Sequence, residues 1–521
     1  MTSAYNSSPH ASRTESPFQV IPPELQQEIF LKNTEVDDPS HDRLRTARYT
    51  SQVCRSWRTL LLQWPRIWGR LLDLNSLAKS KEQWMEEVIS RIGEAPIWME
   101  GRIKRRTYPL VLAVLETKWP NVQVLQLEGR LERCPIENWS FLGREAPSLE
   151  RLSIHFPDRV LSFPSHYSSL LFNDLAPRLR ELELSLAFQV EVTAPWFSHL
   201  GTLIISTAQK VARILSILQN TPLLERLHLL PGSIITENDM EVISVNLPRL
   251  ELLHVGYDEY REAVPFLESI TPSSRCLLSM QQATHDDDDT VTAMKMFTAV
   301  LKWLATYSAG CRVKDITLEI STTRSNNGRF SFLDIHGLQD SEQGQPSFLR
   351  ASLNALIPFN DADPGFMLEA LINSSLFYSV SRLRLRMFTY NHQNVILRLL
   401  QTFPSVTELV TDPKTINDLC NNGPTQAQPL FFPRLHTLEV RPARDEHRGL
   451  TASHLQAACN FVEQRAALGS PVSFLDIRDL TSYVYDGSNE EVEKCMKKID
   501  GGVVKVRWGP KVHPSNLRQQ T

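Results

Sequence analysis

From residue 120 onward, apolar positions recur in one pattern, in which a leucine precedes a pair of alternating apolar residues. One copy places Leu179 three residues before Leu182, and Leu184 follows with Glu183 between them. Clear copies lie at 120–127, 147–154, 177–184, 222–229, 248–255, 433–440 and 472–477, a weaker copy lies at 200–205, and further copies lie at 313–318, 380–385 and 404–409. Alternation of this kind predicts a short strand with one buried face. The residues between the buried positions are then expected on the opposite face.

The intervals between the copies carry apolar residues at helical spacing. Val211, Ile214, Leu215 and Leu218 follow the i, i+3, i+4, i+7 rule, and the segments 396–403, 455–462 and 492–499 repeat it. One strand with one helix cannot bury its apolar face alone, so such units must stack. The spacing between copies, mostly about 21 to 30 residues, is typical of leucine-rich repeats. An ordinary α/β sheet whose strands happen to share this pattern is the alternative.

The sequence therefore predicts an α/β fold in which a leucine-rich-repeat solenoid, with one strand and one helix per repeat, occupies residues 120–510. The pattern is lost near 320–380, which is expected to be an insert. Ser325 to Gly328 predicts a hairpin turn there, and 501–508 predicts a final strand. Before the repeats, residues 1–17 are expected to form a disordered tail, 18–75 a small helical domain and 76–119 a helical bridge. Residues 511–521 are expected to form a second tail.

The helical domain carries two apolar segments separated by a polar insert. The first reads Ile21-Pro22-Pro23-Glu24-Leu25 and continues to Ile29-Phe30. The second runs from Val53 through Cys54-Arg55-Ser56-Trp57-Arg58 to Trp64-Pro65-Arg66-Ile67-Trp68. Two prolines fit the first turn of a helix, and the apolar residues of each segment share one helical face. A module of about fifty residues buries only a thin core, so an apolar face commonly remains for a partner.

This combination of motifs resembles the F-box, and leucine-rich repeats commonly accompany an F-box in that family. The resemblance implies that the module binds a Skp-type adaptor and, through it, a cullin-based ubiquitin ligase. The residues that it assigns to adaptor binding are Pro22, Pro23, Leu25, Ile29, Phe30, Val53, Trp57, Trp64 and Trp68. The chain departs from the family in a longer gap between Phe30 and Val53 and in the basic segment 43–50.

Composition excludes several classes of partner. The chain has 521 residues, with 55 basic and 59 acidic side chains and a net charge of −4. This balance gives no basis for global attraction to nucleic acid or to anionic membranes. No apolar run is long enough for a membrane span, and no secretory signal is expected. The seven cysteines form no C-x-x-C pair, which favours reduced thiols in the cytoplasm or nucleus.

No motif for catalysis, a cofactor or a metal is present. The chain lacks the phosphate-binding, zinc-hydrolase and nucleophile-elbow patterns, so no catalytic residue and no cofactor are predicted. His285 and the aspartates at 286–289 are consecutive, so their side chains do not converge as a cation requires. No metal site is predicted.

The resemblance to the F-box family, together with the absence of catalytic motifs, implies a non-catalytic subunit that recruits a protein substrate of unknown identity. A repeat scaffold that never assembles a ligase is one alternative, and an enzyme with its active site in 320–380 is another. The substrate is expected on the polar strand face, at Gln126, Ser153, Glu183, Ile204, His228, His254, Thr317, Arg382, Arg384, Arg386, Glu439, Arg441 and Asp476. Because arginine concentrates in the C-terminal half of this set, that half is expected to bind an acidic or phosphorylated segment.

Overall fold

The structure is a computed structural model, in which the chain divides into two compact units, Met1–Leu200 and Gly201–Thr521. It describes residues 21–32, 43–129, 139–155, 171–184, 191–236, 243–257, 260–282, 290–310, 315–325, 328–339, 347–349, 357–358, 369, 371–374, 377–387, 393–421, 430–441, 452–478 and 505–507. The two expected tails and the predicted helix at 492–499 lie outside these ranges.

The first unit begins with short helices: α1 (Pro23–Lys32), α2 (Arg43–Thr50), α3 (Arg55–Gln63), α4 (Pro65–Gly69), α5 (Leu74–Leu77) and α6 (Glu82–Ile92). Pro23 is the first residue of α1 and Pro65 is the first residue of α4. A backbone N–H at this position has no acceptor within the helix, so its absence in proline costs no hydrogen bond. The helices predicted from the two apolar segments are thereby confirmed. Their buried side chains include Phe30, Leu31, Leu44, Leu61, Ile67 and Trp68.

Five parallel strands follow in the first unit, in the order β1 (Leu72–Asp73), β2 (Ile97–Arg102), β3 (Val122–Glu128), β4 (Arg151–His155) and β5 (Glu181–Leu184). Helix α7 (Tyr108–Lys118) connects β2 to β3. The expectation of helices alone at 76–119 is wrong, because β2 lies in that segment and pairs with both β1 and β3. The sheet therefore begins before the first copy of the repeated pattern.

Short 3-10 helices in this unit carry buried aromatic residues that contact one another. They are η2 (Trp119–Asn121), η5 (Ser140–Gly143), η6 (Leu171–Asp174) and η7 (Pro195–His199). The ring of Trp119 lies 5.0 Å from that of Phe141, and the ring of Phe172 lies 5.7 Å from that of Trp196. These contacts join successive strand units through their connecting segments.

The second unit opens with four parallel strands in the order β6 (Thr202–Ile205), β8 (Arg226–Leu229), β11 (Leu252–Tyr257) and β13 (Leu277–Gln282). In sequence, helix α8 (Val211–Gln219) lies between β6 and β8, α9 (Tyr260–Ser269) lies between β11 and β13, and α10 (Thr290–Gly310) follows β13. Two small pairs, β7 (Gln209–Lys210) with β9 (Ile234–Ile235) and β10 (Val245–Leu247) with β12 (Ile270–Pro272), complete this part.

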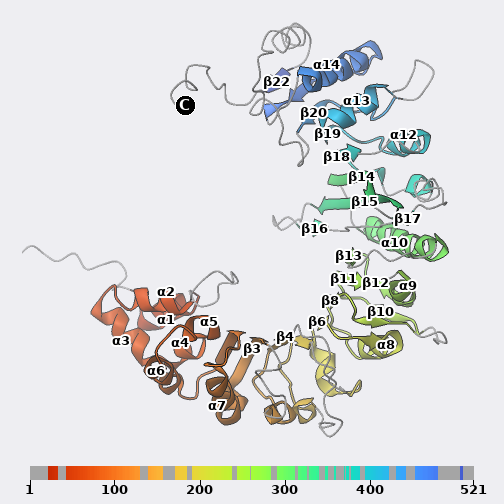
Figure 1. Ribbon diagram of the computed structural model, residues 1–521. Helices are drawn as coiled ribbons and strands as arrows, with labels where there is room; N and C mark the ends of the chain where they lie inside the picture. The colour runs from red at the N-terminus through yellow and green to blue at the C-terminus, as the bar shows by residue number, and fades with distance from the viewer. Residues whose placement is uncertain are drawn as a thin grey trace, which may run out of the picture. The chain divides into compact units, whose positions relative to one another are not determined.

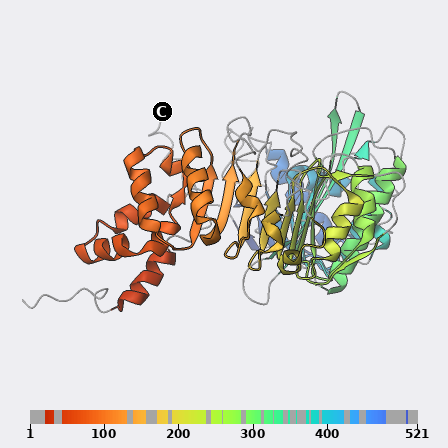
Figure 2. The ribbon, with the colours of Figure 1, turned by 90° about the horizontal axis from the view of Figure 1, so that it is seen from below.

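A second sheet of this unit has the strand order β16-β15-β14-β18-β19-β20-β21-β22, with β17 paired to β15. Its strands are β14 (Asp315–Ser325), β15 (Gly328–Gln339), β16 (Ser347–Leu349), β17 (Ile357–Pro358), β18 (Arg382–Met387), β19 (Glu408–Thr411), β20 (Thr437–Val440), β21 (Phe474–Asp476) and β22 (Lys505–Arg507). The antiparallel β14–β15 pair confirms the hairpin predicted at Ser325 to Gly328, and β22 confirms the final strand. Figure 2 shows this hairpin projecting past its neighbours, since β18 pairs only with the first part of β14.

Helices α12 (Gln393–Gln401), α13 (Pro413–Asn421) and α14 (Ala452–Ala467) lie between the strands of this second sheet in sequence. Figure 1 shows the helices of the second unit on one side of its strands. In β18, Leu383 and Leu385 are buried while Arg382, Arg384 and Arg386 are partly exposed. The alternation predicted from sequence is thus confirmed, and it leaves a polar strand face on the side away from the helices.

Candidate functional site

The helical module of the first unit leaves four large apolar side chains in solvent. Leu25 and Ile29 of α1, Tyr49 of α2 and Val53 of the turn after α2 are between 41% and 64% exposed. We call these four residues the docking patch. Leu25 and Ile29 are four residues apart, so they lie on the same side of α1. Exposed apolar residues grouped on one small module are typical of a protein-binding surface.

Aromatic residues of the motif hold the helices of this module together. The ring of Phe30 meets that of Trp57 edge-on, with centroids 5.2 Å apart. The indole N–H of Trp68 donates to the carbonyl of Leu61 at 2.9 Å. Phe30 and Trp68 were expected to contact the adaptor directly, but both are buried, so that expectation is wrong for this conformation. Their ring contacts fix the helices that present the patch.

The other predicted adaptor residues reach the surface to different extents. Pro22 and Pro23 are exposed, whereas Trp57 and Trp64 are half-buried. Tyr49 was not predicted, and its hydroxyl accepts a hydrogen bond from Nε of Arg45 at 2.9 Å. The sequence signal for Tyr49 was its place in the basic segment between the two motif halves.

Arginine is concentrated in the segment that carries Tyr49 and Val53 of the docking patch. Residues 43–72 contain seven arginines and no acidic residue. Arg43 is buried against Glu100 of β2, with Nη2 and Oε2 2.5 Å apart, and Arg70 lies over the ring of Trp98. The others in α2, α3 and α4, namely Arg45, Arg48, Arg55, Arg58 and Arg66, are exposed. A partner that covers the patch is therefore expected to carry carboxylates around an apolar centre of its own surface.

Cys54 caps the N-terminus of α3 at the edge of this region. Its Sγ accepts the amide N–H of Trp57 at 3.5 Å and lies 3.0 Å from the hydroxyl of Ser56. Hydrogen bonds from Ser56 and then from Trp57 lower the pKa of this exposed thiol from its ordinary value. By contrast, burial raises the pKa of Cys276 to about 12 and that of Cys420 to about 11, so both thiols stay protonated at neutral pH.

The predicted substrate residues fall into rows set by strand register. In the first unit, Gln126 pairs with Ser153 and Ser153 with Glu183. The Ser153 hydroxyl donates to Glu183 at 2.6 Å. These three side chains are partly exposed, as expected for positions between buried leucines.

In the second unit, a row of the first sheet runs from Ile204 through His228 and His254 to Ser279. The imidazole centroids of His228 and His254 are 5.8 Å apart, and Nδ1 of His254 lies 3.0 Å from the Ser279 hydroxyl. Burial lowers the pKa of both histidines, and for His228 the charges of His254 and Arg226 lower it further. Both rings are therefore neutral at pH 7.

A row of the second sheet collects the C-terminal part of the predicted set. Register joins Thr317 to Arg384, Arg384 to Val410, Val410 to Glu439 and Glu439 to Asp476. Asp476 then pairs with Arg507 of β22. The side chain of Thr317 lies outside the described part of the chain. Val410, in the middle of the row, is an apolar residue that the sequence analysis did not name.

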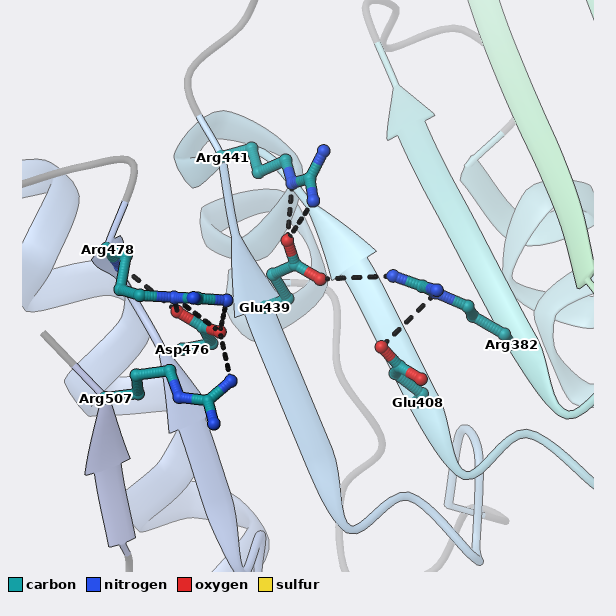
Figure 3. Close-up of polar contacts among 7 residues, drawn as sticks. All are labelled: Arg382, Glu408, Glu439, Arg441, Asp476, Arg478 and Arg507. Atoms are coloured by element: carbon teal, nitrogen blue, oxygen red, sulfur yellow. Dashed lines mark hydrogen bonds and ion pairs between the residues drawn. The ribbon is translucent and has the colours of Figure 1, made fainter. Parts of the chain in front are cut away.

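Ion pairs connect the strands along this face (Figure 3). Arg382 contacts Glu408 at 3.2 Å and Glu439 at 3.4 Å, and Nε of Arg441 donates to Glu439 at 2.5 Å. Asp476 receives Nε of Arg478 at 3.0 Å and Nη2 at 2.8 Å, and Arg507 approaches it to 3.9 Å. Arginine is concentrated in this row as expected, and the carboxylates of the predicted set, Glu439 and Asp476, pair with arginines. Asp476 is also nearly buried rather than open to a substrate.

The described residues give no metal centre, because no three of their His, Cys, Asp or Glu side chains come close enough to hold an ion. His285 and 286–289 lie outside those residues. None of the helices in the described ranges combines the length and apolar composition needed to cross a lipid bilayer. Comparison with protein-family models finds no matching family, and comparison with curated proteins finds no match. The docking patch and the polar strand face are therefore the two features of the chain that bear on its function.

Proposed function

We propose that this chain is the substrate-recognition subunit of a Skp–cullin–F-box type ubiquitin ligase. In this proposal the docking patch binds the Skp-type adaptor, and the polar strand face binds the protein to be ubiquitinated. The observation that carries the proposal is the exposure of Leu25, Ile29 and Val53, three apolar residues of the motif that resembles the F-box. Exposed apolar residues that gather on one small module favour a role in binding another protein.

The repeating strand units supply the second part of the proposal. In copies of the leucine pattern such as those on β4, β8, β18 and β20, the apolar positions are buried and the residues between them are partly exposed. We propose that these units form a leucine-rich-repeat solenoid, whose polar face holds the substrate. The chain would supply no catalytic group, and the associated ligase would act on a substrate held nearby at high effective concentration. This role implies a cytoplasmic or nuclear location.

A scaffold that binds proteins without joining a ligase is the second candidate. It is favoured by the arginines of α2, whose Arg43 is held inward by Glu100 rather than left for an adaptor. Co-expression of the intact chain with a tagged Skp-type adaptor and a cullin separates the two proposals. Recovery of all three proteins in one gel-filtration peak supports the ligase subunit. Recovery of the chain without the adaptor would leave only the scaffold.

A further inference from the structure

The last strands of the second sheet carry cations at the surface and carboxylates beneath them. The side chains of Glu439 and Asp476 are only 12% and 8% exposed, whereas those of Arg441, Arg478 and Arg507 are 42%, 49% and 54% exposed. The carboxylates thus contribute little to the surface that solvent meets. Molecules arriving at this part of the face meet guanidinium groups.

Arg507 has donor groups available for an outside acceptor. Its Nη1 lies 3.9 Å from Asp476, beyond hydrogen-bond distance, and its guanidinium lies 5.3 Å from the ring centroid of Phe474. Arg478 already holds Asp476 through two nitrogens. Within the described ranges, the guanidinium group of Arg507 donates no hydrogen bond. Stacking on Phe474 orients its planar group without using its N–H donors.

Lys505 adds a third cation at the same edge. Register places Lys505 beside Phe474 and Arg507 beside Asp476, so both project from the same side of β22. Lys505 is exposed and pairs with no carboxylate among the described residues. We call Arg478, Lys505 and Arg507 the terminal cation cluster. It holds three positive charges against the single carboxylate of Asp476.

We propose that the terminal cation cluster is a binding site for an acidic polypeptide segment of the substrate, an inference that rests on the proposed function of this face. Oxyanions of that segment accept hydrogen bonds from Arg507 and Lys505, while Asp476 keeps Arg478 in place. A guanidinium offers paired donors that match the two oxygens of a carboxylate or the oxygens of a phosphate. Glutamate, aspartate and phosphorylated side chains share this chemistry.

The arrangement favours an acidic polypeptide over nucleic acid. Beyond the cluster, the arginines of this face are paired with carboxylates, Arg441 with Glu439 on β20 and Arg382 with Glu408 on β19, so the excess positive charge does not extend along the sheet. Non-specific nucleic-acid binding needs many phosphate contacts along an extended basic surface. A short acidic segment needs only one or two oxyanions at the cluster, and its other residues can lie over neutral positions such as Val410.

The test uses fluorescein-labelled peptides of Glu-Gly, phosphoserine-Gly and Gln-Gly repeats, titrated with the full chain and followed by anisotropy. The variant K505Q/R507Q removes two cations but leaves Asp476 bound to Arg478, so the sheet is expected to fold. Its affinity for the acidic peptides is expected to fall about tenfold or more. R151Q, an exposed arginine of β4 that pairs with Glu181 at 3.4 Å, is the matched control and should leave binding unchanged.

Binding of either acidic peptide that depends on Lys505 and Arg507 supports the site, and the two peptides separate carboxylate from phosphate. Equal binding of the Gln-Gly peptide, or no effect of K505Q/R507Q, would overturn the proposal. So would tighter binding of a single-stranded oligonucleotide at the same residues. Adaptor recovery is measured on the same preparations. Loss of the adaptor from the wild-type chain contradicts the proposed function without altering the peptide result.

Discussion

Replacing Leu25 and Ile29 together with alanine tests the docking patch quantitatively. Leu25 is 57% exposed and Ile29 is 41% exposed, so roughly half of each side chain is free to be covered by a partner. Full burial of a leucine or isoleucine side chain contributes about 1.5–3 kcal/mol. Losing half of that at two positions weakens association by about 1.5–3 kcal/mol, which is about 10- to 150-fold in Kd.

The assay is a titration of labelled Skp-type adaptor with the purified variant, alongside a denaturant melt of the same sample. Leu175→Ala is the matched control, because Leu175 is an apolar residue of the first unit that is 44% exposed and lies outside the patch. The control should bind the adaptor as the wild type does. A double variant that retains wild-type affinity would show that the patch does not bind the adaptor. A double variant that no longer unfolds cooperatively would instead show that α1 is needed for folding.

Three further predictions concern stability. Leu182→Ala should lower the free energy of unfolding by about 2–5 kcal/mol, because it leaves a cavity. Glu183→Ala should lower it by only about 1 kcal/mol, because it removes the acceptor of the Ser153 hydrogen bond. Equal stability of the two variants in denaturant melts would contradict the strand assignment. The pKa of His228 and of His254 lies below the ordinary 6.5 in the folded state, so the unfolded chain binds more protons and stability should be lost as pH falls below 6.5. In denaturant melts at several pH values below 6.5, the unfolding free energy of H228N/H254N should depend less on pH than that of the wild type. The same pH dependence in both proteins would refute the assignment. Gly69→Ala would place a Cβ 2.1 Å from the carbonyl oxygen of Pro96, so a cost of about 1–3 kcal/mol or more is expected, and a melt equal to wild type would show that α4 can move away.

The repeated leucine pattern was sufficient to predict eleven strands in the described part of the two units, namely β3, β4, β5, β6, β8, β11, β14, β18, β19, β20 and β21. Its first leucine is buried wherever a clear copy falls on described residues, as at Leu149, Leu179 and Leu250. Strand β2 was missed because helical spacing on both sides of it dominated the interpretation. Ile97 and Met99 do alternate with Trp98 and Glu100, so the signal was present, although no leucine marked it. The alternation of buried and partly exposed positions therefore marks strands, such as β2, that the leucine pattern does not identify.

The side chains facing outward could be predicted, but their partners could not. Alternation alone assigns Glu439 to the polar face, since Leu438 and Val440 are buried. Its contact with Arg382 depends on three strands stacking in register, across 57 residues of sequence. Similarly, Phe30 and Trp68 belong to an apolar motif, and only the packing of α1, α3 and α4 shows that they are interior. Sequence periodicity gives the direction of a side chain, whereas its depth depends on the neighbouring elements.

Net charge was a poor guide to the partners of this chain. The total of −4 excludes general attraction to polyanions, yet residues 43–72 carry seven arginines without a carboxylate. The terminal cation cluster likewise covers its one carboxylate. Charges separated by more than a Debye length, about 8–10 Å at physiological salt, hardly influence one another at an exposed surface. A partner therefore responds to the charges within that distance, and both surfaces proposed here favour acidic partners although the chain as a whole is slightly acidic.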